Sequence, residues 1–142
     1  MKRAMLTGVA LLALVSGEAL ATCGEPYMSE ADVKTLLAGN TVCSPRNCSA
    51  GSCEWQEQHR GGPAGGELWD YKRGPGNTMD PEKKVGTWSI TSSGGLVGAG
   101  KVTHSYKSGA FVYNVKEDGG NHSFCGANGE FTFSVKSGSV GC

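Results

Sequence analysis

Hydrophobic and polar residues alternate most clearly in residues 101–116, which read KVTHSYKSGAFVYNVK. Two short strands, each with one apolar or aromatic face, explain this pattern. The facing residues are Val102, His104 and Tyr106 on the first strand and Phe111, Tyr113 and Val115 on the second. A two-residue turn at Ser108-Gly109 would pair Tyr106 with Phe111, His104 with Tyr113 and Val102 with Val115. The pattern therefore predicts a β-hairpin with one buried face.

A helical pattern is clear only in residues 29–38, SEADVKTLLA. Ser29 is a suitable N-cap, and Gly39 follows the last periodic residue. Val33, Leu36 and Leu37 share one face at helical spacing, so the helix must lie on an apolar surface. We predict that it covers one end of a barrel.

The remaining apolar alternation comes in short segments separated by glycine- and proline-rich turns. We expect strands near residues 41–43, 54–60, 67–73, 85–91, 122–125 and 130–135. A turn at Asn128-Gly129 would place Phe124 opposite Phe133 and His122 opposite Val135. The sequence thus predicts a mainly β protein, a small antiparallel meander barrel of about eight strands with one short N-terminal helix, and a β-sandwich is the alternative that it leaves open. Such a barrel is filled by side chains or holds one small ligand.

The first residues read MKRAMLTGVALLALVSGEALA and have the basic start, short apolar run and A-x-A end of a secretory signal peptide. We predict a signal peptide at 1–21 and a single barrel domain at 22–142, in a periplasmic or secreted protein with no membrane contact after cleavage. An alternative is lipidation of Cys23, because Leu20-Ala21-Thr22-Cys23 loosely resembles a lipobox.

Six cysteines follow the predicted cleavage site: Cys23, Cys43, Cys48, Cys53, Cys125 and Cys142. An even number in an exported chain predicts three disulfides that staple the fold, and the sequence leaves all fifteen pairings open. Cys48 and Cys53 could close their loop on itself, or either could bond Cys43. Metal binding by the Cys43-x4-Cys48-x4-Cys53 series is the rival hypothesis, but export favours oxidation, so we predict no metal site.

Composition narrows the classes of partner. The chain has 13 basic and 13 acidic residues, so neither nucleic acid nor an anionic membrane is an expected partner. Its 23 glycines suit many turns between short strands.

Several short motifs together carry a resemblance to a known group of proteins. These are the signal peptide and short helix, Leu37-x-Gly39-Asn40-Thr41, Val85-Gly86-Thr87-Trp88-Ser89-Ile90, Phe124-Cys125-Gly126 and the C-terminal cysteine. The chain resembles small exported bacterial proteins of unknown function with a lipocalin-like barrel. The resemblance implies a fold and a compartment, and it implies no catalytic residue.

Catalytic motifs are missing from the sequence, which has no Gly-x-Ser-x-Gly, His-Glu-x-x-His or phosphate-binding glycine loop. We therefore assign no catalytic residue and no cofactor. The aromatic residues favour a ligand site at the barrel mouth, with His104, Tyr106, Tyr113 and Trp88 as its candidates. His104 has a structural alternative, as a core histidine bonded to a tyrosine hydroxyl. We expect His59 to have a solvated or interface role and Glu57 to lie on the outer face of the sheet.

These observations support a non-catalytic exported barrel that binds a small apolar or aromatic ligand, or a protein at its loops. The first alternative is an inhibitor of a secreted or periplasmic hydrolase, a protease or lysozyme, acting through a disulfide-braced loop between Cys43 and Cys53. The second is an enzyme with an undetected site. A cavity beside His104 and Tyr113 would favour the ligand-binding hypothesis.

Overall fold

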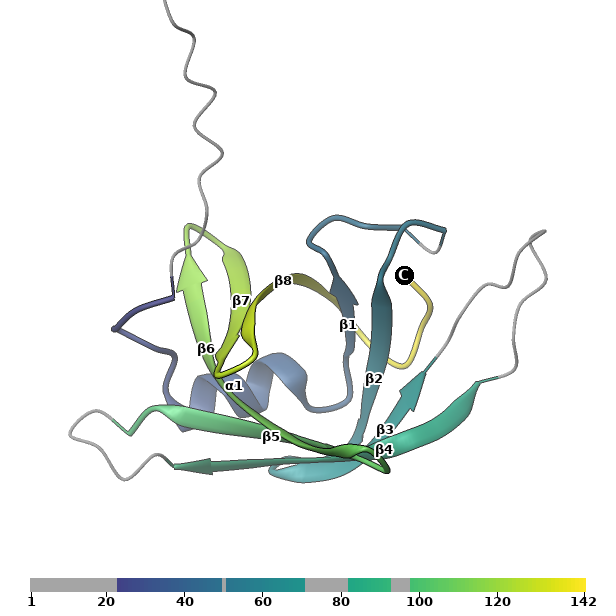
Figure 1. Ribbon diagram of the computed structural model, residues 1–142, viewed down its shortest axis with the longest axis horizontal. Helices are drawn as coiled ribbons and strands as arrows, with labels where there is room; N and C mark the ends of the chain where they lie inside the picture. The colour runs from purple at the N-terminus through teal and green to yellow at the C-terminus, as the bar shows by residue number, and fades with distance from the viewer. Residues whose placement is uncertain (1–22, 50, 71–81, 93–97) are drawn as a thin grey trace, which may run out of the picture.

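The computed structural model describes residues 23–49, 51–70, 82–92 and 98–142, so the predicted signal peptide and Tyr71 to Arg73 of the predicted third strand lie outside the described residues. The described chain forms one helix followed by eight strands (Figure 1). They are α1 (Glu30–Leu37), β1 (Thr41–Ser44), β2 (Trp55–Gly61), β3 (Gly65–Asp70), β4 (Lys83–Ser92), β5 (Gly100–Tyr106), β6 (Gly109–Asp118), β7 (Asn121–Gly126) and β8 (Gly129–Lys136).

The strands close into a barrel in sequence order. Each strand pairs antiparallel with the next, and β8 pairs with β1 to complete the ring. Closure leaves the sheet without an exposed edge. The predicted mainly β, eight-stranded meander barrel is therefore confirmed.

The helix α1 crosses the far end of the barrel in the view of Figure 1. The side chain of Ser29 accepts a hydrogen bond from the Asp32 amide, as its prediction as an N-cap requires. Val33 and Leu37 are fully buried in the core. At the start of β5, Gly100 lies against Val33, where a β-carbon would come within 3.2 Å of the valine side chain. The helix thus seals the end of the barrel at which β5 begins.

The kind of side chain in the core changes along the barrel, from aliphatic at the helix to aromatic at the opposite end. Aliphatic side chains, Val102 and Val115, lie toward the helix, and Phe124, Trp88 and two histidines fill the middle. Aromatic rings that are only partly buried, those of Trp55, Phe111 and Phe131, lie toward the opposite end. That end is where a ligand can enter.

Both predicted hairpins form, but each prediction of their register was wrong by two residues. The β5–β6 turn is Lys107-Ser108, so Tyr106 pairs with Gly109 and His104 with Phe111. Gly109 opens the returning strand with φ of +144°, a conformation that L side chains rarely adopt.

The β7–β8 hairpin differs from its prediction in the same way. Gly126 pairs with Gly129, whose φ is +126°, and Phe124 and His122 face Phe131 and Phe133. In both hairpins the glycine follows the two-residue loop instead of forming its second residue. A shift of two residues keeps every side chain on its predicted face, because side chains alternate with a period of two.

The segment Leu37-x-Gly39-Asn40-Thr41 connects the helix to both the barrel and the C-terminal tail. Gly39 leaves the helix with φ of +75°, and its amide bonds the His59 carbonyl. The Asn40 side chain donates to the Leu36 carbonyl and accepts from the Gly138 amide. The Thr41 hydroxyl accepts from the Val140 amide and donates to the Gly138 carbonyl. This motif therefore holds the chain end against β1.

Three disulfides are present, as predicted: Cys23–Cys125, Cys43–Cys142 and Cys48–Cys53. The first two join positions about one hundred residues apart, and the third closes a short loop. Three disulfides indicate an oxidising, extracellular-type compartment. In the described segments, no helix is long and apolar enough to cross a membrane.

Two glycines make room for two tyrosines on the inner surface of the barrel. Gly86 pairs with Tyr106 across β4 and β5, and Gly126 pairs with Tyr113 across β6 and β7. A β-carbon at residue 86 would lie 3.2 Å from the Tyr106 ring, and one at residue 126 would lie 2.8 Å from the Tyr113 ring. Each ring lies over its partner glycine, which sets the direction of its hydroxyl.

We expect Gly86→Ala to destabilise the fold by about 1–3 kcal/mol, because the new β-carbon would lie 2.2 Å from the Ser105 carbonyl oxygen. Gly51→Ala is the matched control, since nothing lies within 4 Å of its β-carbon. Urea unfolding followed by tryptophan fluorescence measures both variants. Equal unfolding midpoints for the two would contradict the close strand approach at Gly86.

We also expect the disulfides to differ in their contribution to stability. Chain-entropy arithmetic gives about 4 kcal/mol for a staple across many tens of residues and about 2 kcal/mol for a loop as short as Cys48–Cys53. Cys43→Ser/Cys142→Ser should therefore lower the free energy of unfolding more than Cys48→Ser/Cys53→Ser, measured in guanidinium. A larger loss from the short loop would contradict the role of the C-terminal staple.

Candidate functional site

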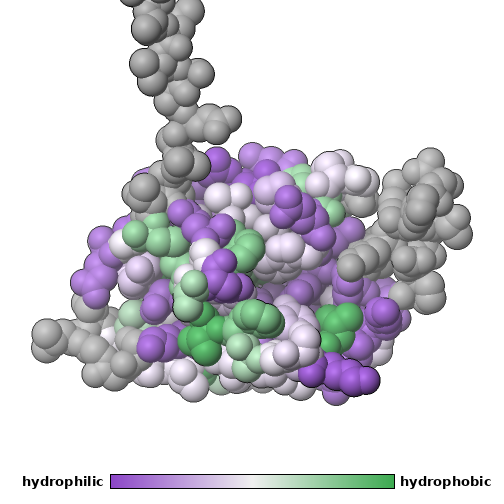
Figure 2. Space-filling view, viewed as in Figure 1, coloured by the Kyte–Doolittle hydropathy of each residue, from purple (hydrophilic) through white to green (hydrophobic). Residues whose placement is uncertain are grey.

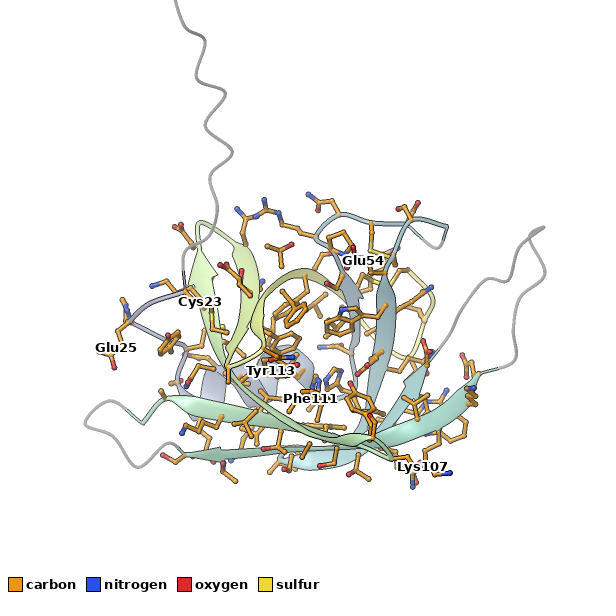
Figure 3. All side chains as sticks on the ribbon, in the orientation of Figure 1. Cys23, Glu25, Glu54, Lys107, Phe111 and Tyr113 are labelled. Carbon is orange, nitrogen blue, oxygen red and sulfur yellow. A yellow bond between two sulfur atoms is a disulfide. The ribbon has the colours of Figure 1, made fainter. Side chains whose placement is uncertain are left out.

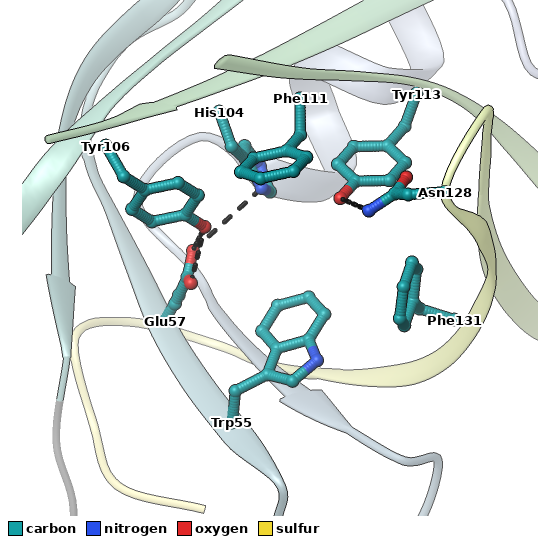
Figure 4. A pocket seen from close by; sticks show the side chains of 8 residues that line it. All are labelled: Trp55, Glu57, His104, Tyr106, Phe111, Tyr113, Asn128 and Phe131. Atoms are coloured by element: carbon teal, nitrogen blue, oxygen red, sulfur yellow. Dashed lines mark hydrogen bonds and ion pairs between the residues drawn. The ribbon is translucent and has the colours of Figure 1, made fainter. Parts of the chain in front are cut away.

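A cavity of about 160 Å³ opens at the barrel end opposite the helix (Figures 3 and 4). Its position follows from β5, which begins beside the helix at Gly100 and ends at the cavity with Tyr106. The side chains that line it are mostly aromatic: Trp55, Glu57, His104, Tyr106, Phe111, Tyr113, Asn128 and Phe131. Figure 4 shows them arranged around a common open space.

Strand periodicity explains why these residues meet. The inward positions near the mouth are Trp55 and Glu57 on β2, His104 and Tyr106 on β5, and Phe111 and Tyr113 on β6. Residues two apart on a strand point to the same face, so each strand contributes two neighbouring side chains. Phe131 enters from β8, and Asn128 comes from the loop before it.

Glu57 and Tyr106 form the polar side of the cavity. The Tyr106 hydroxyl donates to the Glu57 carboxylate, with oxygen–oxygen distances of 2.6 and 2.8 Å. Burial, together with the neighbouring carboxylate, raises the pKa of Tyr106 well above its ordinary value. The tyrosine therefore stays protonated and holds the carboxylate at the cavity wall.

Two histidines lie side by side at the inner end of the cavity, where His104 lines it and His59 lies beneath. Nε2 of His104 is 3.0 Å from Nε2 of His59, and both rings are almost completely buried. Burial lowers the pKa of His104 to about 4. Burial and then the neighbouring His104 lower the pKa of His59 well below its ordinary value, and a backbone contact with Glu57 opposes this only in part. Both rings are therefore neutral near pH 7.

The close contact between the two rings needs one donor and one acceptor. With both rings neutral, one Nε2 donates its proton and the other accepts it. Nδ1 of His104 is 3.9 Å from the Glu57 carboxylate, so this ring also faces the polar side of the cavity.

Ring contacts connect the cavity walls to the core. The Tyr113 ring lies 5.3 Å from Phe124 and 6.0 Å from Phe131, and Trp55 stacks on Phe124 at 6.0 Å. Nδ2 of Asn128 donates to the Tyr113 hydroxyl at 3.1 Å. Because the rings support one another, the walls are formed before any ligand arrives.

Three of the four sequence candidates meet at this cavity: His104, Tyr106 and Tyr113. Trp88 lies deeper, 2% exposed, with its indole N–H donated to the Arg60 carbonyl and its ring against His59. The structural alternative for His104 predicted a tyrosine hydroxyl as its partner, but its close partner is His59.

Sequence reasoning missed Trp55, Glu57, Phe111, Asn128 and Phe131 as cavity residues. The expectations of a solvated His59 and an outer-face Glu57 were wrong, since His59 is fully buried and Glu57 faces the interior. The signal was present in Trp55-x-Glu57-x-His59, where an aromatic residue shares a strand face with both polar ones.

Metal binding has no support in the part of the chain that the structure describes, where no group of three or more His, Cys, Asp or Glu side chains could hold an ion. All six cysteines are in disulfides.

Comparison of the chain with protein-family models, curated proteins and solved structures found no match. The site must therefore be interpreted from its own chemistry.

The buried histidines predict a loss of stability in mild acid. A histidine with a folded-state pKa of about 4 and an unfolded value near 6.5 binds its proton more readily when unfolded, so stability falls as the pH drops through this window. Between pH 7 and pH 5, His104 alone accounts for about 2 kcal/mol. Urea unfolding at the two pH values measures this loss.

The control variants separate the histidines from other titrating groups. His104→Gln should reduce the pH dependence, and adding His59→Gln should reduce it further. The carboxyl pKa values of Glu67 and Glu82 are lowered, so these groups titrate mainly below the range of pH 7 to pH 5. His122→Asn controls for a half-buried histidine whose pKa burial also lowers. An unchanged pH dependence in the double variant would contradict the neutral, buried pair.

Proposed function

We propose that this protein is an exported, non-catalytic β-barrel that binds one small molecule in the cavity between Trp55 and Tyr113. The observation that carries the proposal is the cavity itself, which lies beside His104 and Tyr113 as a binding protein requires. Small-molecule sites are concave, mainly apolar and supplied with a few polar groups. This cavity has that composition, with five aromatic side chains and a carboxylate.

The size of the cavity favours a ligand built around a single ring or a group of similar bulk. Its volume is about 160 Å³, and an engineered apolar cavity of about 150 Å³ in another protein binds benzene. A longer ligand would extend out through the mouth, where Asn128 is exposed.

The supporting contacts favour tight binding of such a ligand. The walls belong to paired strands, and their rings contact one another, so little side-chain freedom remains to be lost on binding. Figure 2 shows hydrophilic and hydrophobic residues intermixed around this face of the molecule, without one broad apolar patch. This surface suits a small ligand better than a protein that docks across the mouth.

The chemistry of the cavity favours binding over catalysis. A general acid or base works best when its pKa lies near the working pH. Burial moves the pKa of Tyr106 upward and that of His104 down to about 4, away from neutrality in both cases. The described residues that line the cavity include no serine, cysteine, threonine or lysine as a nucleophile.

Export by a cleaved signal peptide and kinship with small lipocalin-like bacterial proteins are part of this proposal. The three disulfides support an oxidising compartment, periplasmic or extracellular. Lipidation at Cys23 is disfavoured, because Cys23 is bonded to Cys125.

Inhibition of a secreted hydrolase ranks second. The observation in its favour is the Cys48–Cys53 disulfide, which braces the loop as that hypothesis requires. The loop is further held by the Arg46 amide, which bonds the Thr132 hydroxyl on β8. A braced loop identifies no target, whereas the cavity already limits the size and composition of its ligand.

The three tryptophans provide a test with internal controls. Trp55 lines the cavity, Trp88 lies in the core, and Trp69 lies on the outer face beneath Arg60. We expect neutral one-ring molecules such as toluene and phenol to shift the indole N–H resonance of Trp55 in ¹⁵N NMR spectra. The Trp69 resonance should stay in place, and Trp55→Ala should weaken binding about tenfold.

The paired control is Trp69→Ala, which removes an indole without touching the cavity. Equal shifts at all three indoles, or equal weakening by the two substitutions, would contradict binding in the cavity. Native mass spectrometry of the exported protein would identify any ligand retained during purification.

A further inference from the structure

We propose that the ligand of this cavity is a small organic ammonium cation, which enters with its charged nitrogen toward Glu57 and its methyl or methylene groups against the rings. This inference rests on the proposed function and adds the chemical class of the ligand. Three features of the cavity support it: its ring faces, its carboxylate and the charge of the side chains around them.

Aromatic rings attract cations. The face of each ring carries negative charge density, so a cation within about 6 Å of the ring centre is stabilised, most strongly where water is excluded. Five aromatic side chains surround this cavity: Trp55, Tyr106, Phe111, Tyr113 and Phe131. Neighbouring rings of this set are centred 6.0 to 6.5 Å apart, as for Tyr113–Phe131 and Trp55–Phe131. A group in the open space that these rings surround lies beside several of them together.

The carboxylate supplies the formal charge. Glu57 is only 8% exposed and lines the same cavity, with the Tyr106 hydroxyl 2.6 Å from one of its oxygens. Because the tyrosine lies over Gly86, which keeps its ring in position, the carboxylate has a fixed location at the edge of the aromatic set. Partial burial strengthens its attraction for a cation compared with that of a surface carboxylate.

The groups around the carboxylate do not oppose a cation. His104 borders the cavity and His59 lies beneath it, and burial keeps both neutral near pH 7 by lowering their pKa values. Neither lysine nor arginine is among the described residues that line the cavity. An anionic ligand would meet a carboxylate and the negative faces of the rings, so anions are disfavoured.

Cavity size selects the kind of cation. A trimethylammonium group has about the bulk of a benzene ring, which the volume of about 160 Å³ accommodates. Its methyl groups are apolar and spread the charge, so it loses less hydration on entering an aromatic site than a metal ion or a bare ammonium group would.

The experiment compares choline with 3,3-dimethylbutan-1-ol, a neutral molecule of the same shape with carbon in place of nitrogen. Isothermal titration calorimetry gives both affinities, and the Trp55 indole resonance locates the binding. We expect choline to bind about tenfold more tightly than its neutral isostere. Added salt should reduce the affinity for choline more than that for the alcohol.

Matched variants assign the preference to its causes. Glu57→Gln keeps an oxygen that can accept from Tyr106 and removes the charge, so it should bring the two affinities to within about threefold. Glu67→Gln is the control, because Glu67 is a half-exposed carboxylate paired with Lys84 on the outer face. Trp55→Leu, which keeps an apolar side chain, should weaken choline more than the alcohol, and Trp69→Leu should change neither affinity.

The outcomes separate this inference from the proposed function. Equal affinity for choline and its isostere would overturn the cation inference and leave a small-ligand site. Binding of neutral rings without binding of choline would do the same. A full tenfold preference that survives Glu57→Gln would overturn the placement of the charged nitrogen toward Glu57. Failure of choline, the alcohol and the neutral rings to shift Trp55 at millimolar concentration would overturn both proposals.

Discussion

The imidazole rings of His59 and His104 lie at the centre of the barrel, away from bulk water. Their hydrogen bond to each other constrains the positions of the side chains that pack around them. His59 and His104 come from strands that are not neighbours in the sheet, so their 3.0 Å contact crosses the interior. Aromatic rings enclose the pair, with Trp88 against His59 and Phe124 against His104. A charged imidazole here would be poorly solvated, which is why burial lowers both pKa values.

The contact between the two histidines also helps to position the polar side chains between them and the mouth of the barrel. Nδ1 of His104 lies 3.9 Å from the Glu57 carboxylate, which in turn accepts a hydrogen bond from Tyr106. One series of polar contacts thus leads from the centre of the barrel to its mouth and alternates between two strands, from His59 on β2 to His104 on β5, then to Glu57 on β2 and Tyr106 on β5. In a buried network each polar group that loses its partner costs free energy, which limits the arrangements that its members can adopt. Contacts with side chains of the barrel interior therefore help to fix the position of the Glu57 carboxylate at the cavity wall.

The sequence was sufficient to predict the barrel but not its registers or its interior polar groups. Alternation in residues 101–116 shows which side chains share a face, and the structure keeps that assignment. It does not locate the turn, because a glycine such as Gly109 suits both the turn and the first residue after it. Disulfide pairing was equally open, since it depends on which chain ends meet after the barrel has closed. Asn40 and Thr41 bind the tail that brings Cys142 to Cys43, and the Cys142 amide also donates to the Gln56 side chain.

The inward positions of His59 and Glu57 on β2 were hard to predict for a different reason. A polar residue on the face of a strand is usually solvated, and nothing within β2 itself shows that His59 has a partner on β5. The pairing becomes visible only when the order and tilt of all eight strands place the two rings opposite each other. Sequence patterns report local faces, whereas a polar core depends on contacts between distant segments.

The composition of the inner surface is the strongest argument that the mouth is a site and not an unfinished core. Along β5 the inward residues change from Val102 through His104 to Tyr106, from hydrocarbon near the helix to a polar ring at the opening. A barrel selected for stability alone would bury its mouth as α1 buries the other end. Instead Trp55, Phe111 and Phe131 remain partly exposed around a carboxylate, and the stabilisation that their full burial would provide is forgone. Local departures from the rules of core packing concentrate where a protein functions, and in the described part of this chain the mouth is where they converge.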